Sequence, residues 1–296
     1  MNSPPPAAPA WLPTLERDFP RERVALGGGA VVAVRRCGRP DAPVVVLLHG
    51  IGSAGASWLP CARLLATTHR VIAWDMPGYG GSTPLAGAAP RAEDYALRLE
   101  QLLKALGVTS CLLVGHSLGA IVAAAHAHRY PQRLRALVLL SPAGGYGGPG
   151  QEADQARVRA ERLQALDRLG VAGLAATRGP TLLQPGAPEA ARAWAQWNMA
   201  QLHEAGYRQA VELLCGDDLR RHAPLAVPVH LHVGDADTVT PPARVRTLAT
   251  AFGVAPEAVG LIPQAGHLCA IEQPTAVAQA LRTADASAPG APGALR

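Results

Sequence analysis

One serine lies in a sequence that could make it a nucleophile. Ser117 is the centre of the pentapeptide GHSLG (115–119), which directly follows the apolar run 111–114 and opens the helical pattern LGAIVAAA. A serine between a strand and a helix occupies a sharp turn, and the flanking glycines let the two elements approach closely. The N–H of Leu118 would then lie at the start of a helix, where an oxyanion is stabilised. The pattern predicts attack by Ser117 on a carbonyl carbon.

A base and an acid for this serine follow later in the chain. A hydroxyl is a poor nucleophile at neutral pH, so it needs a base that is itself oriented by a carboxylate. Asp237 comes shortly after the apolar run 229–233, and His267 comes shortly after the run 258–262. The acid thus precedes the histidine, as this arrangement requires. Asp235 is a second candidate for the acid, and we favour Asp237.

Alternating strands and helices must bring these residues together. Short apolar runs predict strands at 44–49, 71–74, 111–114, 136–140, 229–233 and 258–262. Helical patterns lie at 91–106, 240–252 and 273–283, and the second of them has Thr240 as its predicted N-cap. Two runs at 21–26 and 30–36, joined by three glycines, predict an antiparallel hairpin at one edge. We therefore predict an α/β fold with a mostly parallel central sheet and helices on both faces.

One long segment interrupts this alternation. It shows no convincing strand, but it has helical patterns at 151–170, 188–204 and 206–215. We predict a helical cap at 143–226, inserted into an α/β core that consists of 21–142 and 227–283. Prolines and small residues at both ends predict a flexible N-terminal tail at 1–20 and a disordered C-terminal tail at 284–296.

Composition and charge exclude several classes of function. Apolar residues make up 49% of the chain and charged residues 17%, which is enough to bury a large core. The net charge of +5 comes from scattered arginines, because Lys104 is the only lysine, so no basic run could follow a phosphate backbone. No apolar run approaches the roughly 18 residues of a membrane span, and the N-terminus resembles no secretory signal. We expect neither nucleic-acid nor membrane binding, and the sequence leaves a homo-oligomer open.

The cysteines and histidines point to no metal or cofactor. The five cysteines are odd in number and lack the spacing of a metal site. His230 and His232 share one strand face, but no acidic or thiol ligand lies near them in sequence. We therefore expect reduced thiols, a cytoplasmic location, no metal and no cofactor.

Five sequence blocks together resemble the α/β-hydrolase superfamily over about residues 21–282. They are HGIGSAGASW (49–58), WDMPGYGGS (74–82), GHSLGA (115–120), VGDADTVTPP (233–242) and IPQAGHLCAIEQP (262–274). The resemblance implies a catalytic triad of Ser117, Asp237 and His267, because the family places its acid at the last position of G-x-x-D. It also implies that Ile51 supplies the second oxyanion N–H, beside Leu118.

The same resemblance narrows the reaction. Serine as the nucleophile excludes the haloalkane dehalogenases and epoxide hydrolases, which use aspartate, and the dienelactone hydrolases, which use cysteine. Thr240-Pro241-Pro242 and the motif GHL…EQP resemble 3-oxoadipate enol-lactonases and small carboxylesterases. A small ester or enol-lactone is the leading substrate. Carbon–carbon hydrolases of the meta-cleavage type remain an alternative, although they usually have a different residue where this chain has Leu268. A non-enzymatic ligand receptor that keeps the triad is another.

The sequence offers several candidates for the substrate pocket. Aromatic residues in the oxyanion-loop block and the cap could line it, namely Trp58, Tyr146, Trp194 and Trp197. A lactone derived from a dicarboxylate would favour an arginine in the pocket, and the cap offers Arg178, Arg192 and Arg208 among others. We expect His116, next to the nucleophile, to point away and serve structure.

Overall fold

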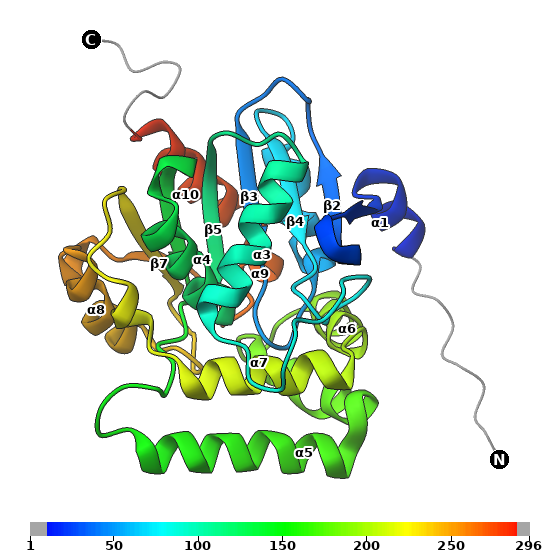
Figure 1. The fold of residues 1–296 in the computed structure, drawn as a ribbon, viewed down its shortest axis with the longest axis vertical. Helices are drawn as coiled ribbons and strands as arrows, with labels where there is room; N and C mark the ends of the chain where they lie inside the picture. The colour runs from blue at the N-terminus through cyan, green and yellow to red at the C-terminus, as the bar shows by residue number, and fades with distance from the viewer. Residues whose placement is uncertain (1–10, 289–296) are drawn as a thin grey trace.

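An eight-stranded sheet forms the centre of the computed structural model, which describes residues 11–288 (Figure 1). The order across the sheet is β1-β2-β4-β3-β5-β6-β7-β8. The strands are β1 (Arg21–Ala25), β2 (Val31–Cys37), β3 (Val44–Leu48), β4 (Arg70–Trp74), β5 (Cys111–His116), β6 (Leu134–Leu140), β7 (Val229–Gly234) and β8 (Gly260–Ile262). β2 pairs antiparallel with both β1 and β4, and all other neighbours are parallel. The predicted mostly parallel sheet with an antiparallel edge hairpin is confirmed.

Helices cover both faces of the sheet. They are α1 (Leu12–Asp18), α2 (Leu59–Leu65), α3 (Ala92–Ala105), α4 (Leu118–Arg129), α8 (Pro242–Ala249), α9 (Cys269–Glu272) and α10 (Pro274–Ala286). Alternate side chains of β3 point to opposite faces: Val46 and Leu48 pack with α3 and α4, whereas Val45 and Leu47 pack with α1, α2 and α10. Burial on both faces explains why the central strands read as continuous apolar runs.

Three further helices lie between β6 and β7. They are α5 (Glu152–Arg178), α6 (Glu189–Ala200) and α7 (Glu204–Gly216), and they lie at one end of the sheet (Figure 1). This segment is helical, as the sequence predicts, and we call residues 143–226 the cap. α5 runs eight residues beyond the predicted end, through a break at Gly170, where φ is 62° and ψ is −179°.

The N-terminal prediction of a flexible tail is wrong for the part of it that the structure describes. α1 packs against the sheet through Leu15 and Phe19, both fully buried. The guanidinium of Arg35 donates to the Phe19 carbonyl at 2.6 Å and to the Glu16 carboxylate at 2.8 Å. Residues 1–10 of the predicted tail lie outside the described residues.

The C-terminal tail prediction is also wrong at its start. α10 continues to Ala286. Asp285 is buried, and hydrogen bonds to its carboxylate from Arg135 at 2.8 Å and from His69 at 3.2 Å compensate the loss of water. Residues 289–296 lie outside the described residues.

All five cysteines are free thiols. Among residues 11–288, the helices lack the combination of length and hydropathy that a membrane span needs.

Candidate active site

Ser117 occupies a strained turn between β5 and α4. Its φ of 52° and ψ of −117° fall in a region that L-residues rarely adopt. Glycines are required on both sides: a Cβ on Gly115 would lie 2.5 Å from the carbonyl oxygen of Gly119, and one on Gly119 would lie 2.7 Å from that of His49. The strand, the turn and the helix therefore hold the serine as the sequence predicts for a nucleophile.

Asp237 and His267 are joined by a hydrogen bond at the ends of neighbouring strands. The Nδ1 atom of His267 lies 2.9 Å from Oδ2 of Asp237. The same carboxylate accepts from the backbone N–H groups of Val239, at 2.8 Å, and Thr240, at 2.9 Å, and from the Thr240 hydroxyl, at 2.8 Å. Thr240 is therefore a hydrogen-bond donor to the carboxylate. It is not the predicted N-cap of α8, which begins at Pro242.

The surroundings of Asp237 keep it ionised. Burial raises the pKa of the carboxyl, but the hydrogen bonds from His267 and Thr240 outweigh it and lower the pKa to about 2. An ionised Asp237 fixes the proton of His267 on Nδ1, which leaves Nε2 free to accept a proton. The other candidate acid, Asp235, is exposed, and its carboxylate accepts a hydrogen bond from the Ala265 N–H at 3.3 Å.

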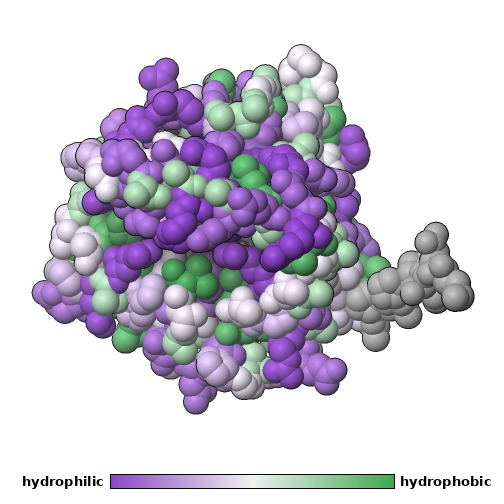
Figure 2. Space-filling model, turned by 90° about the horizontal axis from the view of Figure 1, so that it is seen from below, coloured by the Kyte–Doolittle hydropathy of each residue, from purple (hydrophilic) through white to green (hydrophobic). Residues whose placement is uncertain are grey.

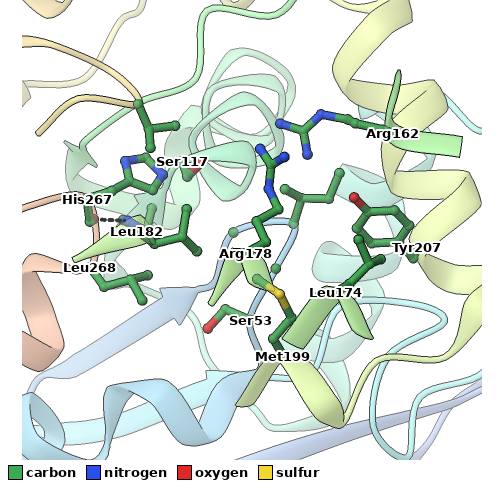
Figure 3. Close-up of a pocket in the computed structure, with 15 residues that line it drawn as sticks. Ser53, Ser117, Arg162, Leu174, Arg178, Leu182, Met199, Tyr207, His267 and Leu268 are labelled. Atoms are coloured by element: carbon green, nitrogen blue, oxygen red, sulfur yellow. Dashed lines mark hydrogen bonds between the residues drawn. The ribbon is translucent and has the colours of Figure 1, made fainter. Parts of the chain in front are cut away.

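His267 and Ser117 line the same cavity, with their side chains next to each other (Figure 3). Two backbone hydrogen bonds hold His267: its N–H donates to the Leu182 carbonyl of the cap at 2.9 Å, and its carbonyl accepts from Nε2 of His116 at 2.8 Å. His116 therefore does not point away from the site, as we expected from the sequence, but positions the histidine loop. Burial, with the neighbouring His267 adding to it, lowers the pKa of His116 to about 3, so this imidazole is neutral.

The loop that carries Ile51 is held by two side chains. His49 accepts a hydrogen bond from the Met76 N–H on Nε2, at 3.0 Å, so its Nδ1–H donates to the Gly50 carbonyl, at 2.8 Å. The hydroxyl of Tyr79 donates to the Ile51 carbonyl at 2.8 Å. Both partners come from the predicted sequence blocks, but nothing in the sequence assigned these contacts to them.

Ile51 and Leu118 both lie beside Ser117. Ile51, Ser117 and Leu118 line one cavity together. A Cβ on Gly50 would lie 2.9 Å from Cβ of Ser117, so the loop touches the nucleophile. Within residues 11–288, neither N–H donates to another protein group. The assignment of these two N–H groups to an oxyanion hole remains a prediction.

Two cavities meet at Ser117, beneath the cap. The narrower one, about 40 Å³, lies between the strand ends and cap residues, which are Arg162, Leu174, Arg178, Leu182, Met199 and Tyr207 (Figure 3). The wider one, about 490 Å³, extends from Ser117 past Tyr146 and Leu214. Figure 2 shows the face of the molecule on the cap side, which is mostly hydrophilic, with apolar side chains exposed in a hollow near its middle.

The structure separates the predicted pocket aromatics. Tyr146 lines the wider cavity. Trp194 and Trp197 instead pack against Trp11, with ring centroids 3.9 Å and 4.8 Å from it, and neither lines the two cavities at Ser117. Trp58 is buried in the core beneath the oxyanion loop. The prediction that these three tryptophans line the pocket is therefore wrong: Trp11, the N-cap residue of α1, packs against the two in α6, and Trp58 belongs to the core.

The three arginine candidates are also separated. Arg178 lines the narrow cavity, as does Arg162, which we did not single out. Arg192 donates to the Ala187 carbonyl, and Arg208 pairs with Glu204 and Asp167 on the surface. Since cap arginines are numerous and carry no motif, the sequence contains no signal that selects the two that point inward.

Comparisons with known proteins identify the family of the chain. A family model described as "Alpha/beta hydrolase family" matches residues 45–280. The putative carbamate hydrolase RutD of Enterobacter cloacae subsp. cloacae is 30% identical over 240 residues, which cover 79% of this chain and 87% of that protein. The RutD protein of Pantoea ananatis is 42% identical over 101 residues, but the match spans only 34% of this chain and 37% of that relative's length.

A solved structure shows the same fold. The enol-lactonase from Burkholderia xenovorans LB400 superimposes with a TM-score of 0.77 at 24% sequence identity, covering 88% of this chain and 98% of that one. At this identity the likeness is one of fold.

Proposed function

Because the chain belongs to the alpha/beta hydrolase family, we propose that it is a serine hydrolase that cleaves small carboxylic esters or enol-lactones through an acyl-enzyme. One observation carries the proposal: His267 is hydrogen-bonded to the buried Asp237 carboxylate and lies next to the strained Ser117. A base and a nucleophile in this relation are the requirement for activating a hydroxyl.

The reaction begins with attack of the Ser117 oxygen on the carbonyl carbon. The hydroxyl proton passes to Nε2 of His267, and Asp237 stabilises the imidazolium that forms. The N–H groups of Ile51 and Leu118 hold the oxyanion, and each such donor contributes roughly 3–4 kcal/mol to transition-state stabilisation. His267 then gives its proton to the leaving oxygen, which completes the acyl-enzyme.

Water completes the cycle. A water molecule that replaces the leaving group loses a proton to His267 and attacks the acyl carbon, and collapse of the second tetrahedral intermediate restores Ser117. The cap at 143–226 has the role of a lid that limits access of solvent to these steps. The chemistry uses only this chain's own groups, with no cofactor, and the partner is a small molecule. The five free cysteines support the proposal of a cytoplasmic location.

Carbamates are the second candidate substrates. The two RutD relatives are named putative carbamate hydrolases, and one of them matches most of this chain. A carbamate also presents a carbonyl carbon to Ser117, with a nitrogen attached in place of the acyl carbon of an ester, so the same triad serves both candidate substrates. The carbon–carbon hydrolase alternative is less favoured, because Leu268, in place of the usual aromatic residue of that class, lines the narrow cavity.

Covalent labelling tests the proposal. A fluorophosphonate probe should modify the wild-type protein and fail to modify Ser117→Ala, because only an activated serine reacts. Ser110→Ala is the matched control, since Ser110 is an exposed hydroxyl immediately before β5. Absence of labelling in folded wild-type protein would contradict the hydrolase proposal. Labelling together with negligible release of nitrophenol from p-nitrophenyl acetate and butyrate would favour the ligand receptor.

A further inference from the structure

Two arginines of the cap point into the cavity that contains Ser117 and His267. Arg162 and Arg178 both line it, and Figure 3 shows their guanidinium groups near each other on the side of the cavity away from the histidine. The hydroxyl of Tyr207, from α7, lines the same wall. Two cations and a phenol thus face a small space that is otherwise mostly apolar.

These two arginines lack an acidic partner although they face a cavity. Four other arginines of the cap pair with carboxylates: Arg157 with Asp154 and Glu161, Arg159 with Glu212, Arg208 with Asp167 and Glu204, and Arg220 with Asp218. The remaining three, Arg168, Arg192 and Arg221, form no ion pair among the described residues, but they are exposed to solvent. Within the described residues, no carboxylate forms an ion pair with Arg162 or Arg178, and Nη1 of Arg162 is buried without a hydrogen-bond partner. Asp154 lines the adjoining wider cavity, but its carboxylate is the one that Arg157 binds.

The unpaired charges are costly for the protein alone. Burial, and beyond it the charge of Arg162, lowers the pKa of Arg178. Arginine remains charged in proteins, so two such groups in one cavity repel each other unless an anion lies between them. A carboxylate accepts two parallel hydrogen bonds from a guanidinium, which makes it a matching occupant.

A break in α5 brings the two arginines together. Sixteen positions separate them in sequence, and a straight helix would place them about 24 Å apart. At Gly170, between them, φ is 62° and ψ is −179°, a backbone conformation that is almost restricted to glycine. A Cβ at this position would meet nothing within 4 Å, so glycine is needed here for the chain direction and not for space.

We propose that the substrate carries a carboxylate, which Arg162 and Arg178 bind while Ser117 attacks the ester or lactone carbonyl of the same molecule. The inference rests on the proposed function, because it places the carbonyl at Ser117. It assigns the substrate to half-esters or lactones of dicarboxylic acids. The two arginines are then the residues that distinguish these anionic substrates from neutral esters.

A matched pair of methyl esters tests the proposal. Monomethyl glutarate carries a carboxylate where methyl pentanoate has a methyl group, and the two acyl chains are otherwise alike. Acid release from each would be followed for the wild type, Arg162→Gln and Arg178→Gln, with monomethyl succinate and adipate included to vary the distance. Arg168→Gln is the control, because Arg168 is an exposed arginine of the same helix.

The expected result is a loss confined to the anionic esters. The kcat/KM of the wild type should be higher for monomethyl glutarate, or for its best-fitting homologue, than for the neutral ester. Each arginine variant should lower this value roughly 10- to 100-fold and leave methyl pentanoate nearly unchanged. Arg168→Gln should behave as the wild type does. Equal wild-type values for the charged and neutral esters, or equal losses for both in the variants, would overturn the proposal.

A binding measurement separates this proposal from the proposed function. Glutarate binding to Ser117→Ala protein, measured by calorimetry, does not depend on hydrolysis. Tight binding that Arg178→Gln weakens, together with no labelling of wild-type Ser117, would keep the carboxylate site and reject the hydrolase. Labelling of Ser117 without glutarate binding would keep the hydrolase and reject the carboxylate site.

Discussion

The charged groups at the strand ends and those in the cap differ in whether the protein itself supplies their partners. At the strand ends, both oxygens of Asp237 accept hydrogen bonds, and its partner His267 is fixed through its ring and its backbone. In the cap, Arg162 and Arg178 face the same cavity, and no carboxylate among residues 11–288 pairs with either of them. The difference separates two tasks. The reacting groups are held in place before any ligand arrives, whereas the two arginines that select the substrate obtain their anionic partner only from the ligand.

Replacement of Asp237 by asparagine should produce the largest effect on activity. The N–H groups of Val239 and Thr240 would hold the amide oxygen in the place of Oδ1, so the amide NH₂ would face Nδ1 of His267. The imidazole would then carry its proton on Nε2, where it cannot accept one from Ser117. We expect kcat to fall about 10⁴-fold, with the fold unchanged by circular dichroism.

Asp235→Asn is the matched control for this variant. Asp235 lies two positions away in the same motif, but it is exposed, and its carboxylate accepts from the Ala265 N–H and not from His267. Its replacement should leave kcat near the wild-type value. If the two variants lost activity equally, Asp237 would not be the acid of the site, and its hydrogen bond to His267 would not preorganise the reacting groups.

Asp237 should also make stability depend on pH at the acid end. Its pKa falls from an ordinary 3.8 to about 2 in the folded protein. A depressed pKa contributes stability that is present above the unfolded-state value and is lost as pH falls toward the folded-state value. The contribution is about 2 kcal/mol near neutral pH and disappears between about pH 4 and pH 2.

Denaturant unfolding of the wild type and Asp237→Asn at several pH values would measure this contribution. The difference in unfolding free energy between the two proteins should shrink toward low pH, because protonation makes the wild-type carboxyl neutral like the amide. A difference that stays constant with pH would show that the carboxylate is not stabilised by its hydrogen bonds, which would remove the contrast with the unpaired arginines.

The same two regions differ in how far the sequence predicts them. The strand ends were predictable because each reacting residue follows an apolar run and lies in a constrained motif: GHSLG must have its glycines, since a Cβ on Gly115 or Gly119 would meet backbone atoms. Ser117, Asp237 and His267 were brought together by the topology that the alternating strands and helices predict. The geometry of the turn thus constrains which residues can stand on either side of Ser117.

The cap and α1 were less predictable because no such constraint applies to them. α1 has Leu12, Leu15 and Phe19 on one stripe, a pattern too short to distinguish from the proline-rich segment before it. The sequence does not show that Trp11, at the N-cap of α1, packs against Trp194 and Trp197, so these two could be assigned to the pocket as easily as to packing. Among many cap arginines, only the three-dimensional path of α5 selects Arg162 and Arg178.

The smallest of these effects, and the one most specific to the cap, concerns Gly170. Gly170→Ala should disfavour the break in α5 and move Arg178 relative to Arg162. Because alanine is strained in this conformation, we expect a loss of about 1–3 kcal/mol in stability. The preference for monomethyl glutarate over methyl pentanoate should fall about tenfold, the equivalent of about 1.4 kcal/mol, whereas labelling of Ser117 by the fluorophosphonate should persist.

Gly186→Ala separates strain from arginine placement. Gly186 also lies in the cap with a positive φ, of 82°, and a Cβ there would likewise meet nothing within 4 Å, but it does not line the cavity. It should therefore lower stability in the same way and leave the ester preference intact. If both glycine variants changed the preference equally, selection would follow from the general rigidity of the cap. A change confined to Gly170→Ala would show that the break exists to aim two charges at one carboxylate.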